Sequence, residues 1–275
     1  MTPIDRPCVL VTGAGRGLGR AIAETFHAKG YFVVATDHDE ALLADLEGRS
    51  GFWTTRQDVR DVEAAAEVAQ QIRERCGRLD VVVNNAGVNR FYPVSEAPAQ
   101  QTIDAFMINT LGAVVVTQAC FDLLVETGGR VVNIASESST FRPPFQVYQA
   151  TKMALEAVSD VLRREFQLLG VHVAIIRPGA IDTDLIKGAQ HVEVDLPGSR
   201  FEPYFPTLRR MVARGMPKSV STPTEVANVV HLAATDPRKR AMYRVNNDPK
   251  QRLAALLPKR MMDKILFRMF RLPSD

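Results

Sequence analysis

A glycine-rich turn near the N-terminus constrains the fold of this chain more than any other feature of its sequence. The apolar run Val9–Thr12 leads directly into Gly13-Ala14-Gly15-Arg16-Gly17-Leu18-Gly19, and a helical pattern begins immediately after it. Glycines allow backbone angles that other residues avoid, and they let the main chain approach a pyrophosphate at the positive end of a helix. A strand, a glycine turn and a helix in this order predict a dinucleotide-binding site.

The spacing of these glycines differs from the common G-x-G-x-x-G pattern. Leu18 occupies the last glycine position of that pattern, so Gly13, Gly17 and Gly19 form G-x-x-x-G-x-G instead. A glycine-rich turn without a ligand is the alternative interpretation. The strand before the turn and the helix after it favour dinucleotide binding, and the variant spacing indicates a narrower group of proteins.

Short apolar runs and helical stretches alternate along the chain. The runs lack polar alternation, as strands buried on both faces do, and the stretches between them repeat apolar residues every three or four positions. This order predicts a Rossmann-type doubly wound parallel sheet with helices on both faces, in a single domain spanning 1–275. The predicted strands are Val9–Thr12, Phe32–Thr36, Val81–Val83, Val131–Ile134 and Val171–Ile176, and the clearest helices are Arg20–Lys29, Val62–Arg75 and Met153–Leu169.

Composition and charge exclude several other classes of protein. The 275 residues are 46% hydrophobic with a net charge of +3, which is typical of a globular domain and too weak for a nucleic-acid-binding protein. Cys8, Cys76 and Cys120 form no CxxC pair and no histidine cluster completes a zinc site, so we expect reduced core residues and no metal. The absence of a signal peptide and of an apolar run of about 18 residues predicts a cytoplasmic protein.

Asp37 ends the second predicted strand, about twenty residues after the glycines, where an acid accepts hydrogen bonds from the adenosine ribose. A carboxylate there repels the additional phosphate of NADP, so the sequence favours NAD as the cofactor. Arg16 inside the glycine turn is the opposing signal, because a base there helps to hold a 2′-phosphate. A helix N-cap is the alternative role for Asp37, and His38 and Asp39 compete for it.

Tyr148 and Lys152 stand four residues apart at the start of a helical run, so their side chains share one face. Both groups ordinarily have pKa values well above neutral pH, and a nearby ammonium favours the phenolate form of a tyrosine. We therefore expect Lys152 to lower the pKa of Tyr148 and to make this tyrosine a usable base. A Tyr-x-x-x-Lys pair alone is uninformative, because helices often carry it by chance.

The order of the motifs gives that pair its meaning. A series of motifs along nearly the whole chain resembles the short-chain dehydrogenase/reductase family in both order and context. The series comprises Thr12 to Gly19, Asp37, Asp58-Val59, Asn84-Asn85-Ala86-Gly87, Asn109, Ser136, Tyr148 with Lys152, and Pro178-Gly179. The resemblance implies an NAD(P)-dependent alcohol dehydrogenase or ketoreductase, which transfers a hydride between the nicotinamide and an alcohol or carbonyl carbon.

The same resemblance implies a role for each matching residue. Tyr148 would exchange a proton with the substrate oxygen, and Ser136 would hydrogen-bond that oxygen. Lys152 would hold the nicotinamide ribose, and Asn109 would anchor a water linking Lys152 to solvent, or else be a buried helix-kinking amide. The cofactor-binding residues would be Thr12, Gly13, Arg16, Gly17, Leu18, Gly19, Asp37, Asp58, Val59, Asn85, Ala86, Gly87, Tyr148, Lys152, Pro178, Gly179, Ile181 and Thr183, with a helix cap as the alternative for Asp58.

The position of Ser136 departs from the pattern of many relatives. Ser136 precedes Tyr148 by twelve residues, whereas many relatives place the serine one residue further upstream, where this chain has Ala135. A loop shorter by one residue would still bring Ser136 to the tyrosine. Ser138 and Ser139 are the alternatives, since geometry decides this role.

The stretch 184–220 breaks the alternating pattern with prolines and aromatic residues, and it predicts a substrate-covering lid. The stretch 155–185 resembles the retinol- and hydroxysteroid-dehydrogenase branch of the family, which implies a lipophilic secondary alcohol or ketone such as a steroid or retinoid. Candidate lid residues of the pocket, or alternatively of lid-to-core packing, are Phe201, Tyr204, Phe205, Leu208, Met211 and Met216, and candidate walls are Phe91, Phe141, Phe145 and Gln146.

The C-terminal extension 249–275 contains a basic amphipathic pattern between Leu256 and Leu272. Such a helix lies on an anionic membrane, packs on a partner subunit or covers the pocket, and we favour packing over peripheral membrane contact. The family resemblance further implies a homodimer or homotetramer.

Other functions stay open at the level of sequence. A non-catalytic NAD-binding sensor or scaffold would lose Tyr148 or Lys152, and both are present. An NADP-dependent carbonyl reductase is the alternative that Arg16 supports. A dehydratase or epimerase usually has a larger C-terminal domain, for which the residues after Gly179 leave little room. An oxidoreductase is therefore the leading function, although fold alone fixes neither its substrate nor its direction.

Overall fold

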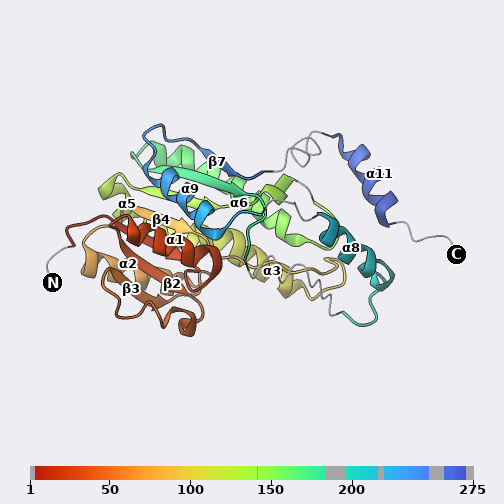
Figure 1. Cartoon of the computed structure of the whole chain (residues 1–275), viewed down its shortest axis with the longest axis horizontal. Coiled ribbons are helices and arrows are strands. Elements are labelled where there is room, and N and C mark those ends of the chain that lie inside the picture. The colour runs from red at the N-terminus through yellow and green to blue at the C-terminus, as the bar shows by residue number, and fades with distance from the viewer. Residues whose placement is uncertain (1–3, 141, 184–195, 216–219, 248–256, 271–275) are drawn as a thin grey trace.

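Seven parallel strands form one sheet in the computed structural model, which describes residues 4–140, 142–183, 196–215, 220–247 and 257–270 (Figure 1). The order across the sheet is β3-β2-β1-β4-β5-β6-β7, so the chain starts in the middle, winds to one edge and then to the other. The strands are β1 (Cys8–Thr12), β2 (Phe32–Asp37), β3 (Phe52–Arg56), β4 (Val81–Asn84), β5 (Arg130–Ile134), β6 (His172–Pro178) and β7 (Met242–Val245). The predicted doubly wound fold in a single domain is confirmed.

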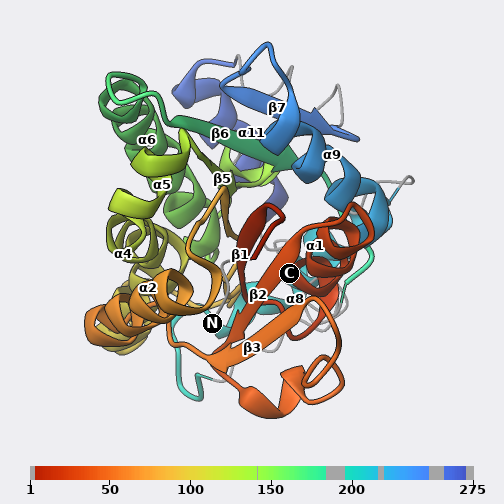
Figure 2. The same cartoon turned by 90° about the vertical axis from the view of Figure 1, so that its left-hand side faces the viewer.

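Helices cover both faces of the sheet (Figure 2). On one face lie α1 (Gly17–Ala28) and α9 (Pro223–Thr235), which pack against each other. The other face is covered by α2 (Val62–Cys76), α4 (Gly112–Ala119), α5 (Phe121–Thr127) and α6 (Val147–Gln167). Two further helices, α8 (Phe205–Gly215) and α11 (Lys259–Phe270), contact each other at one end of the molecule (Figure 1).

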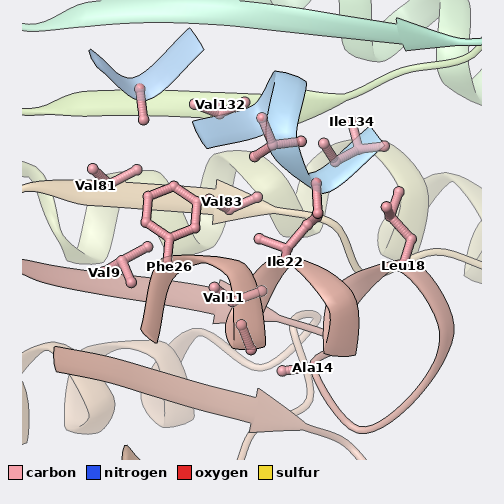
Figure 3. Close-up of a cluster of buried hydrophobic side chains, with 14 of the residues drawn as sticks. Val9, Val11, Ala14, Leu18, Ile22, Phe26, Val81, Val83, Val132 and Ile134 are labelled. Carbon is pink, nitrogen blue, oxygen red and sulfur yellow. The ribbon is translucent and has the colours of Figure 1, made fainter. Parts of the chain in front are cut away.

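Two apolar layers follow from the alternation of side chains along each strand, since successive residues point to opposite faces. Val9 and Val11 of β1 lie in the layer beneath α1, together with Ile22 and Phe26 (Figure 3). Leu10 lies in the other layer, between the sheet and the helices of the α2 side. Every residue of β1 is buried, which explains why this run shows no polar alternation.

Local sequence signals explain where the helices begin and end. Asp61 caps the N-terminus of α2 by accepting a hydrogen bond from the backbone amide of Ala64 at 3.0 Å, and Gly77 ends this helix with a left-handed φ of 71°. Thr222 and Glu225 form a reciprocal capping box at the start of α9. These caps fix both helices beside the strands that they connect.

The strands at the two edges of the sheet are absent from the sequence-based prediction. Each edge strand pairs with one neighbour only, and each mixes apolar with exposed polar residues, so neither β3 nor β7 shows a continuous buried run. The helix predicted over Met153–Leu169 begins earlier, at Val147, which places Tyr148 in its first turn.

One helical stretch is more apolar than the sequence-based prediction implies. Helix α3 (Ala99–Phe106), a π turn (Met107–Leu111) and α4 together form the run Ala99–Ala119. Among the described residues, this run alone is long and apolar enough to cross a membrane by length and composition, with a mean hydropathy of 1.2. It packs against α2 and α6.

The three cysteines are buried, and their thiols are free. All three lie in the apolar layer on the α2 side of the sheet, as expected for reduced core residues.

The predicted lid and the predicted C-terminal extension are described in part. Residues 196–215 of the lid contain the 3-10 turn Glu202–Tyr204 and α8, whereas 184–195 and 216–219 lie outside the described residues. Within the extension 249–275, the described part contains α11, and 249–256 and 271–275 lie outside. Phe141 and Met216, two of the candidate pocket residues, also lie outside the described residues.

Candidate active site

The glycine turn joins β1 to α1, and its conformation requires glycine at positions 13, 17 and 19. Gly13 has a left-handed φ of +64°. Gly17 has a φ of +56°, in the left-handed region that residues with a Cβ rarely adopt. Gly19 packs so closely that an added Cβ would lie 1.9 Å from the carbonyl oxygen of Gly13. Leu18, in the first turn of α1, is buried, while Arg16 is exposed at the N-cap of this helix. The turn thus places the N-terminal amides of α1 where they can bind an anionic group.

Thr12 and Asn85 join the glycine turn to the segment after β4. The Thr12 hydroxyl accepts hydrogen bonds from the backbone amides of Asn85 (3.1 Å) and Ala86 (3.2 Å). In return, Nδ2 of Asn85 donates to the carbonyl oxygens of Thr12 (3.0 Å) and Gly13 (3.2 Å). Four hydrogen bonds therefore hold two distant parts of the sequence together at the carboxyl ends of β1 and β4.

Asp37 ends β2, and its carboxylate contacts the glycine turn. Its Oδ2 accepts a hydrogen bond from the backbone amide of Gly15 at 3.0 Å, and its Oδ1 accepts one from the amide of Asp39 at 3.2 Å. Nδ1 of His38 lies 2.9 Å from the same Oδ1. Asp39 caps the next 3-10 turn by accepting from the amide of Ala41. Asp37 is therefore not the helix cap, and its buried carboxylate lies beside the turn.

Asp58 and Val59 follow the end of β3. Arg60 pairs with Asp58, its Nη2 lying 2.6 Å from Oδ2, and this hydrogen bond lowers the pKa of the Asp58 carboxyl. Val59 is buried, and its Cγ2 would lie 2.7 Å from a Cβ added at Gly112. Because Asp61 caps α2, the alternative role of Asp58 as the cap of that helix is not met.

Tyr148 and Lys152 lie one turn apart on α6, beside the end of β5. The Tyr148 side chain lies beside that of Ser136, which follows β5, close enough for this serine to lower the pKa of the phenol. Lys152 is 3% exposed and donates from Nζ to the carbonyl oxygen of Ile134 at 2.8 Å. Its Nζ lies 5.8 Å from the centre of the Tyr148 ring. The structure therefore brings the three predicted side chains together at the carboxyl edge of the sheet.

Burial dominates the acid–base properties of this pair. It raises the pKa of Tyr148 to about 12, although the neighbouring Ser136 side chain acts in the opposite direction. Burial also lowers the pKa of Lys152 to about 8. This result corrects the expectation that Lys152 brings the pKa of Tyr148 down towards neutrality. The buried phenolate would lose its hydration, and the Lys152 ammonium donates to the Ile134 carbonyl.

Ser138 lies next to Ser136 in the 3-10 turn after β5. The two hydroxyl oxygens are 2.7 Å apart, and the backbone amide of Ser138 donates to Oγ of Ser136 at 3.2 Å. Ser136 is the serine that contacts Tyr148, and Ser138 orients it. The side chain of Ser139 lies outside the described residues.

Asn109 lies in the π turn between α3 and α4, a rare element that recurs at functional sites. Its Oδ1 accepts from the amide of Val88 (2.7 Å), and its Nδ2 donates to the carbonyl of Val88 (2.8 Å) and to the hydroxyl of Thr151 (3.0 Å). A Cβ added at Gly87 would lie 3.2 Å from Asn109 Oδ1 and 3.5 Å from Lys152 Nζ. Gly87, Asn109 and Lys152 therefore meet at one point, and the water-holding role of Asn109 stays a prediction.

The segment after β6 closes the site opposite the glycine turn. Pro178 ends the strand, and the amide of Gly179 donates to the last residue of β7 at 2.9 Å. Ile181 pairs with the segment before α9 in an isolated parallel bridge. The Thr183 methyl group would lie 3.6 Å from a Cβ added at Gly17, so this segment reaches the glycine turn.

A chain of buried amides at the ends of β4 and β5 escaped the sequence-based prediction. Nδ2 of Asn84 donates to Oδ1 of Asn133 (2.8 Å) and to the hydroxyl of Thr117 (3.0 Å), and Nδ2 of Asn133 donates to the hydroxyl of Ser159 on α6 (2.8 Å). These residues position the two strand ends that lead to Asn85 and Ser136. An asparagine at or next to the end of each of two consecutive apolar runs is the sequence signal that could have revealed them.

An aromatic cluster borders the site on the lid side. Phe145, three residues before Tyr148, has a φ of +67°, which is uncommon for an aromatic residue. Its ring meets Phe201 and Phe205 of the lid at centroid distances of 5.4 and 5.9 Å, and Phe270 of α11 at 5.9 Å. Other members of this aromatic cluster are Phe91, Tyr204, Leu208, Met211 and Val212. Part of the predicted lid, α11 and the segment before Tyr148 thus share one apolar contact region.

Known proteins are similar to this chain in sequence and in fold. A model of the short chain dehydrogenase family matches residues 7–193. The NADPH-dependent 3-dehydrocapnine reductase of Ornithobacterium rhinotracheale is 30% identical over 272 residues, which cover 94% of this chain and 95% of the relative. The D-threitol dehydrogenase of Mycolicibacterium smegmatis is 36% identical over 192 residues, which cover 66% of this chain and 73% of the relative. The crystal structure of a short-chain dehydrogenase from Streptomyces avermitilis superposes with a TM-score of 0.76 at 28% identity. The match covers 96% of this chain and 95% of that structure.

The family match includes the glycine turn, Asp37, Asn109 and the Ser136–Tyr148–Lys152 group. Similar proteins that cover most of this chain carry the names dehydrogenase and reductase. The chain belongs to the short-chain dehydrogenase family and is an NAD(P)-dependent alcohol dehydrogenase or ketoreductase.

Proposed function

We propose that Tyr148 exchanges a proton with the oxygen of a lipophilic alcohol or ketone, and that Ser136 hydrogen-bonds the same oxygen. The contact between Tyr148 and Ser136, beside the buried Lys152, carries this proposal. A substrate oxygen within reach of both hydroxyls receives a proton from one and a stabilising hydrogen bond from the other. The raised pKa keeps Tyr148 protonated at neutral pH, which suits the donation of a proton to a ketone oxygen.

The residues around the glycine turn fit a dinucleotide. No side chain fits at Gly19, so glycine there lets the first turn of α1 pack against Gly13 and Asn85. The N-terminus of α1, held in this way, would bind the pyrophosphate. Asp37 would hold the adenosine ribose, and Lys152 with the segment Asn85–Gly87 would hold the nicotinamide ribose. When bound, the nicotinamide supplies or accepts the hydride.

Asp37 supports NAD as the preferred cofactor. Its carboxylate is 5% exposed and is fixed by the Gly15 amide, so it would meet the 2′-phosphate of NADP with little screening by water. The exposed Arg16 and the NADPH-dependent relative support NADP instead. We give more weight to Asp37, because it is fixed in place.

Asp37→Asn is expected to reduce the preference for NAD over NADP by about 10- to 100-fold, the usual range for one charge-assisted hydrogen bond. The amide oxygen can still accept from Gly15, so the variant removes the charge and keeps the shape. Kd values for NAD and NADP, measured by calorimetry, give the preference. Asp39→Ala is the matched control, because that carboxylate caps an exposed turn. Tighter binding of NADP than of NAD by the wild-type chain would contradict the proposal.

The rate of ketone reduction is expected to stay level from about pH 6 to about pH 7 and to fall as the pH rises through about 8. Burial lowers the pKa of Lys152 to about 8, so its ammonium is present below that pH and is lost above it. Tyr148 stays protonated throughout, since its pKa is about 12. In Lys152→Arg the guanidinium does not deprotonate, and the fall should move to higher pH even at a lower rate. An unchanged pH profile in this variant would exclude Lys152 as the titrating group.

The aromatic cluster supports an apolar substrate. Its rings come from the lid, from α11 and from the segment before Tyr148, so a substrate entering on this side meets mainly apolar groups. The names of the two relatives give different substrates, 3-dehydrocapnine and D-threitol. Because these substrates differ, we base the proposed substrate on the aromatic cluster and not on these names. We therefore propose a bulky lipophilic alcohol or ketone, such as a steroid, a retinoid or a long-chain alcohol.

The absorbance of the reduced nicotinamide tests this function directly. The assay combines NAD or NADP with steroids, retinoids and secondary alcohols of increasing chain length, and it runs the matching ketones in the reverse direction. We expect turnover with NAD that improves with the apolar size of the substrate. Turnover of small polar alcohols only would contradict the lipophilic substrate. Binding of NAD without turnover of any substrate would favour a non-catalytic sensor.

Phe270→Ala is expected to raise the KM for long apolar substrates by about tenfold and to leave kcat for the shortest substrate unchanged. The change removes a buried ring that contacts Phe145, and truncation of a buried phenylalanine costs about 3–5 kcal/mol of local packing. Kinetics across the chain-length series measure the effect. Phe267→Ala, on the same helix but 74% exposed, is the matched control. An equal loss for short and long substrates would show that Phe270 supports the fold and not the pocket.

A further inference from the structure

The two sides of α11 have different surroundings. Leu266 and Phe270 are buried, and the Phe270 ring packs in the aromatic cluster against Phe145 and Leu208. Since these two residues are four positions apart, they lie on one side of the helix. This inner side holds α11 against the lid, close to the segment that leads to Tyr148.

The outer side of α11 exposes large apolar residues. Met261, Ile265 and Met269 repeat every four positions and form an apolar stripe, with relative exposures of 51%, 39% and 46%. Phe267 is 74% exposed on the other flank of the helix. Side chains of this size gathered on one short helix mark a surface that binds an apolar partner, because scattered exposure on an ordinary surface does not produce such a stripe.

A basic stripe runs directly beside the apolar stripe. Arg260, Lys264 and Arg268 are exposed, and each precedes one member of the apolar stripe by one residue. Among the residues that the structure describes, none of the three takes part in an ion pair. Cationic side chains bordering an apolar face are the composition of a helix that lies in the interface of an anionic membrane.

We propose that α11 docks on the surface of an anionic lipid bilayer. The apolar stripe would enter the boundary between headgroups and acyl chains, and the basic stripe would contact the lipid phosphates. A second copy of this chain is a poorer occupant, because an isologous contact through this side would bring like charges close together. Docking would place the lid side of the site at the bilayer, so that a lipophilic substrate enters from the lipid; this last step rests on the proposed function.

Flotation of the full chain with lipid vesicles tests the docking. We expect the chain to float with vesicles of phosphatidylcholine and phosphatidylglycerol, and to bind pure phosphatidylcholine at least about tenfold more weakly. Replacing the three residues of the apolar stripe with serine is expected to reduce binding to the anionic vesicles by at least about tenfold. Circular dichroism and turnover of a water-soluble substrate verify that the variant is folded.

Two double variants test whether vesicle binding depends on the basic stripe itself or only on the net charge of the chain. Lys264→Gln with Arg268→Gln is expected to remove the preference for anionic vesicles. Lys29→Gln with Lys239→Gln lowers the net charge equally at exposed sites elsewhere and should bind as the wild type does.

Either of two results would overturn the proposal. The first is no flotation of the wild type, or equal flotation of the wild type and the serine variant. The second combines two observations: the wild type binds no vesicles, and light scattering shows that the serine variant has a different oligomeric state from the wild type. Together these would show that the apolar stripe is an interface between copies of the chain. Because flotation requires no turnover, a failure here is distinct from a failure of the proposed function.

Discussion

Replacing Tyr148 with phenylalanine is expected to lower kcat by about 10²- to 10⁴-fold while the affinity for NAD changes little. The variant keeps the ring near Lys152 and removes only the hydroxyl that contacts Ser136. One positioned general acid or base contributes an acceleration of this size. Single-turnover reduction rates and the Kd of NAD, measured on the same sample, separate lost chemistry from lost binding.

Tyr92→Phe is the matched control for this experiment. Tyr92 is also a buried tyrosine, and its hydroxyl accepts a hydrogen bond from Thr102 at 3.3 Å. Its ring packs against Val147, the residue before Tyr148. Losing the Tyr92 hydroxyl should cost about 1 kcal/mol of stability and leave kcat within a few-fold of wild type. Wild-type kcat in Tyr148→Phe would show that another group protonates the substrate oxygen.

Gly19→Ala is expected to abolish NAD binding. A Cβ at this position would lie 1.9 Å from the carbonyl oxygen of Gly13 and 2.5 Å from Nδ2 of Asn85, so both the turn and its link to β4 must move. Calorimetry gives the loss of affinity, and the Tm shows how much of the effect is unfolding. Undiminished NAD binding by a folded Gly19→Ala variant would place the dinucleotide elsewhere.

Gly17→Ala separates backbone strain from collision in the same turn. Gly17 has a left-handed φ, but the nearest atom to an added Cβ is 3.6 Å away, which is ordinary contact. A left-handed alanine costs about 1–2 kcal/mol, so this variant should weaken NAD binding by roughly tenfold. We expect the two variants to differ because only one of them forces the backbone to move.

The architecture of the site could be predicted because the sheet is parallel. Thr12, Asn85 and Ser136 each follow a buried apolar run, and the carboxyl ends of parallel strands meet at one edge. Motif order then placed Tyr148 and Lys152 beside them, since a helix must return over the sheet between β5 and β6. Neither inference required any knowledge of side-chain contacts.

The electrostatics and the lid side could not be predicted in the same way. Spacing shows that Tyr148 and Lys152 share a helix face, but the direction of a pKa shift depends on how much water reaches each group. The left-handed backbone of Phe145 has no local signal, because such conformations are expected at glycine or asparagine. Contacts from Phe201 and Phe270, remote in sequence, hold it there.

The pairing of Asn84 with Asn133 has a consequence for how this protein can change. The two residues are partners in the β4–β5 register, and their side chains hydrogen-bond on the same face of the sheet. A one-residue insertion in either strand would turn one amide to the opposite face and shift every functional group beyond it. Strand lengths are therefore locked, whereas the lid and α11 lie outside this register. Under the proposed function, mutations in the predicted lid or in α11 would therefore change the range of substrates without moving the catalytic residues.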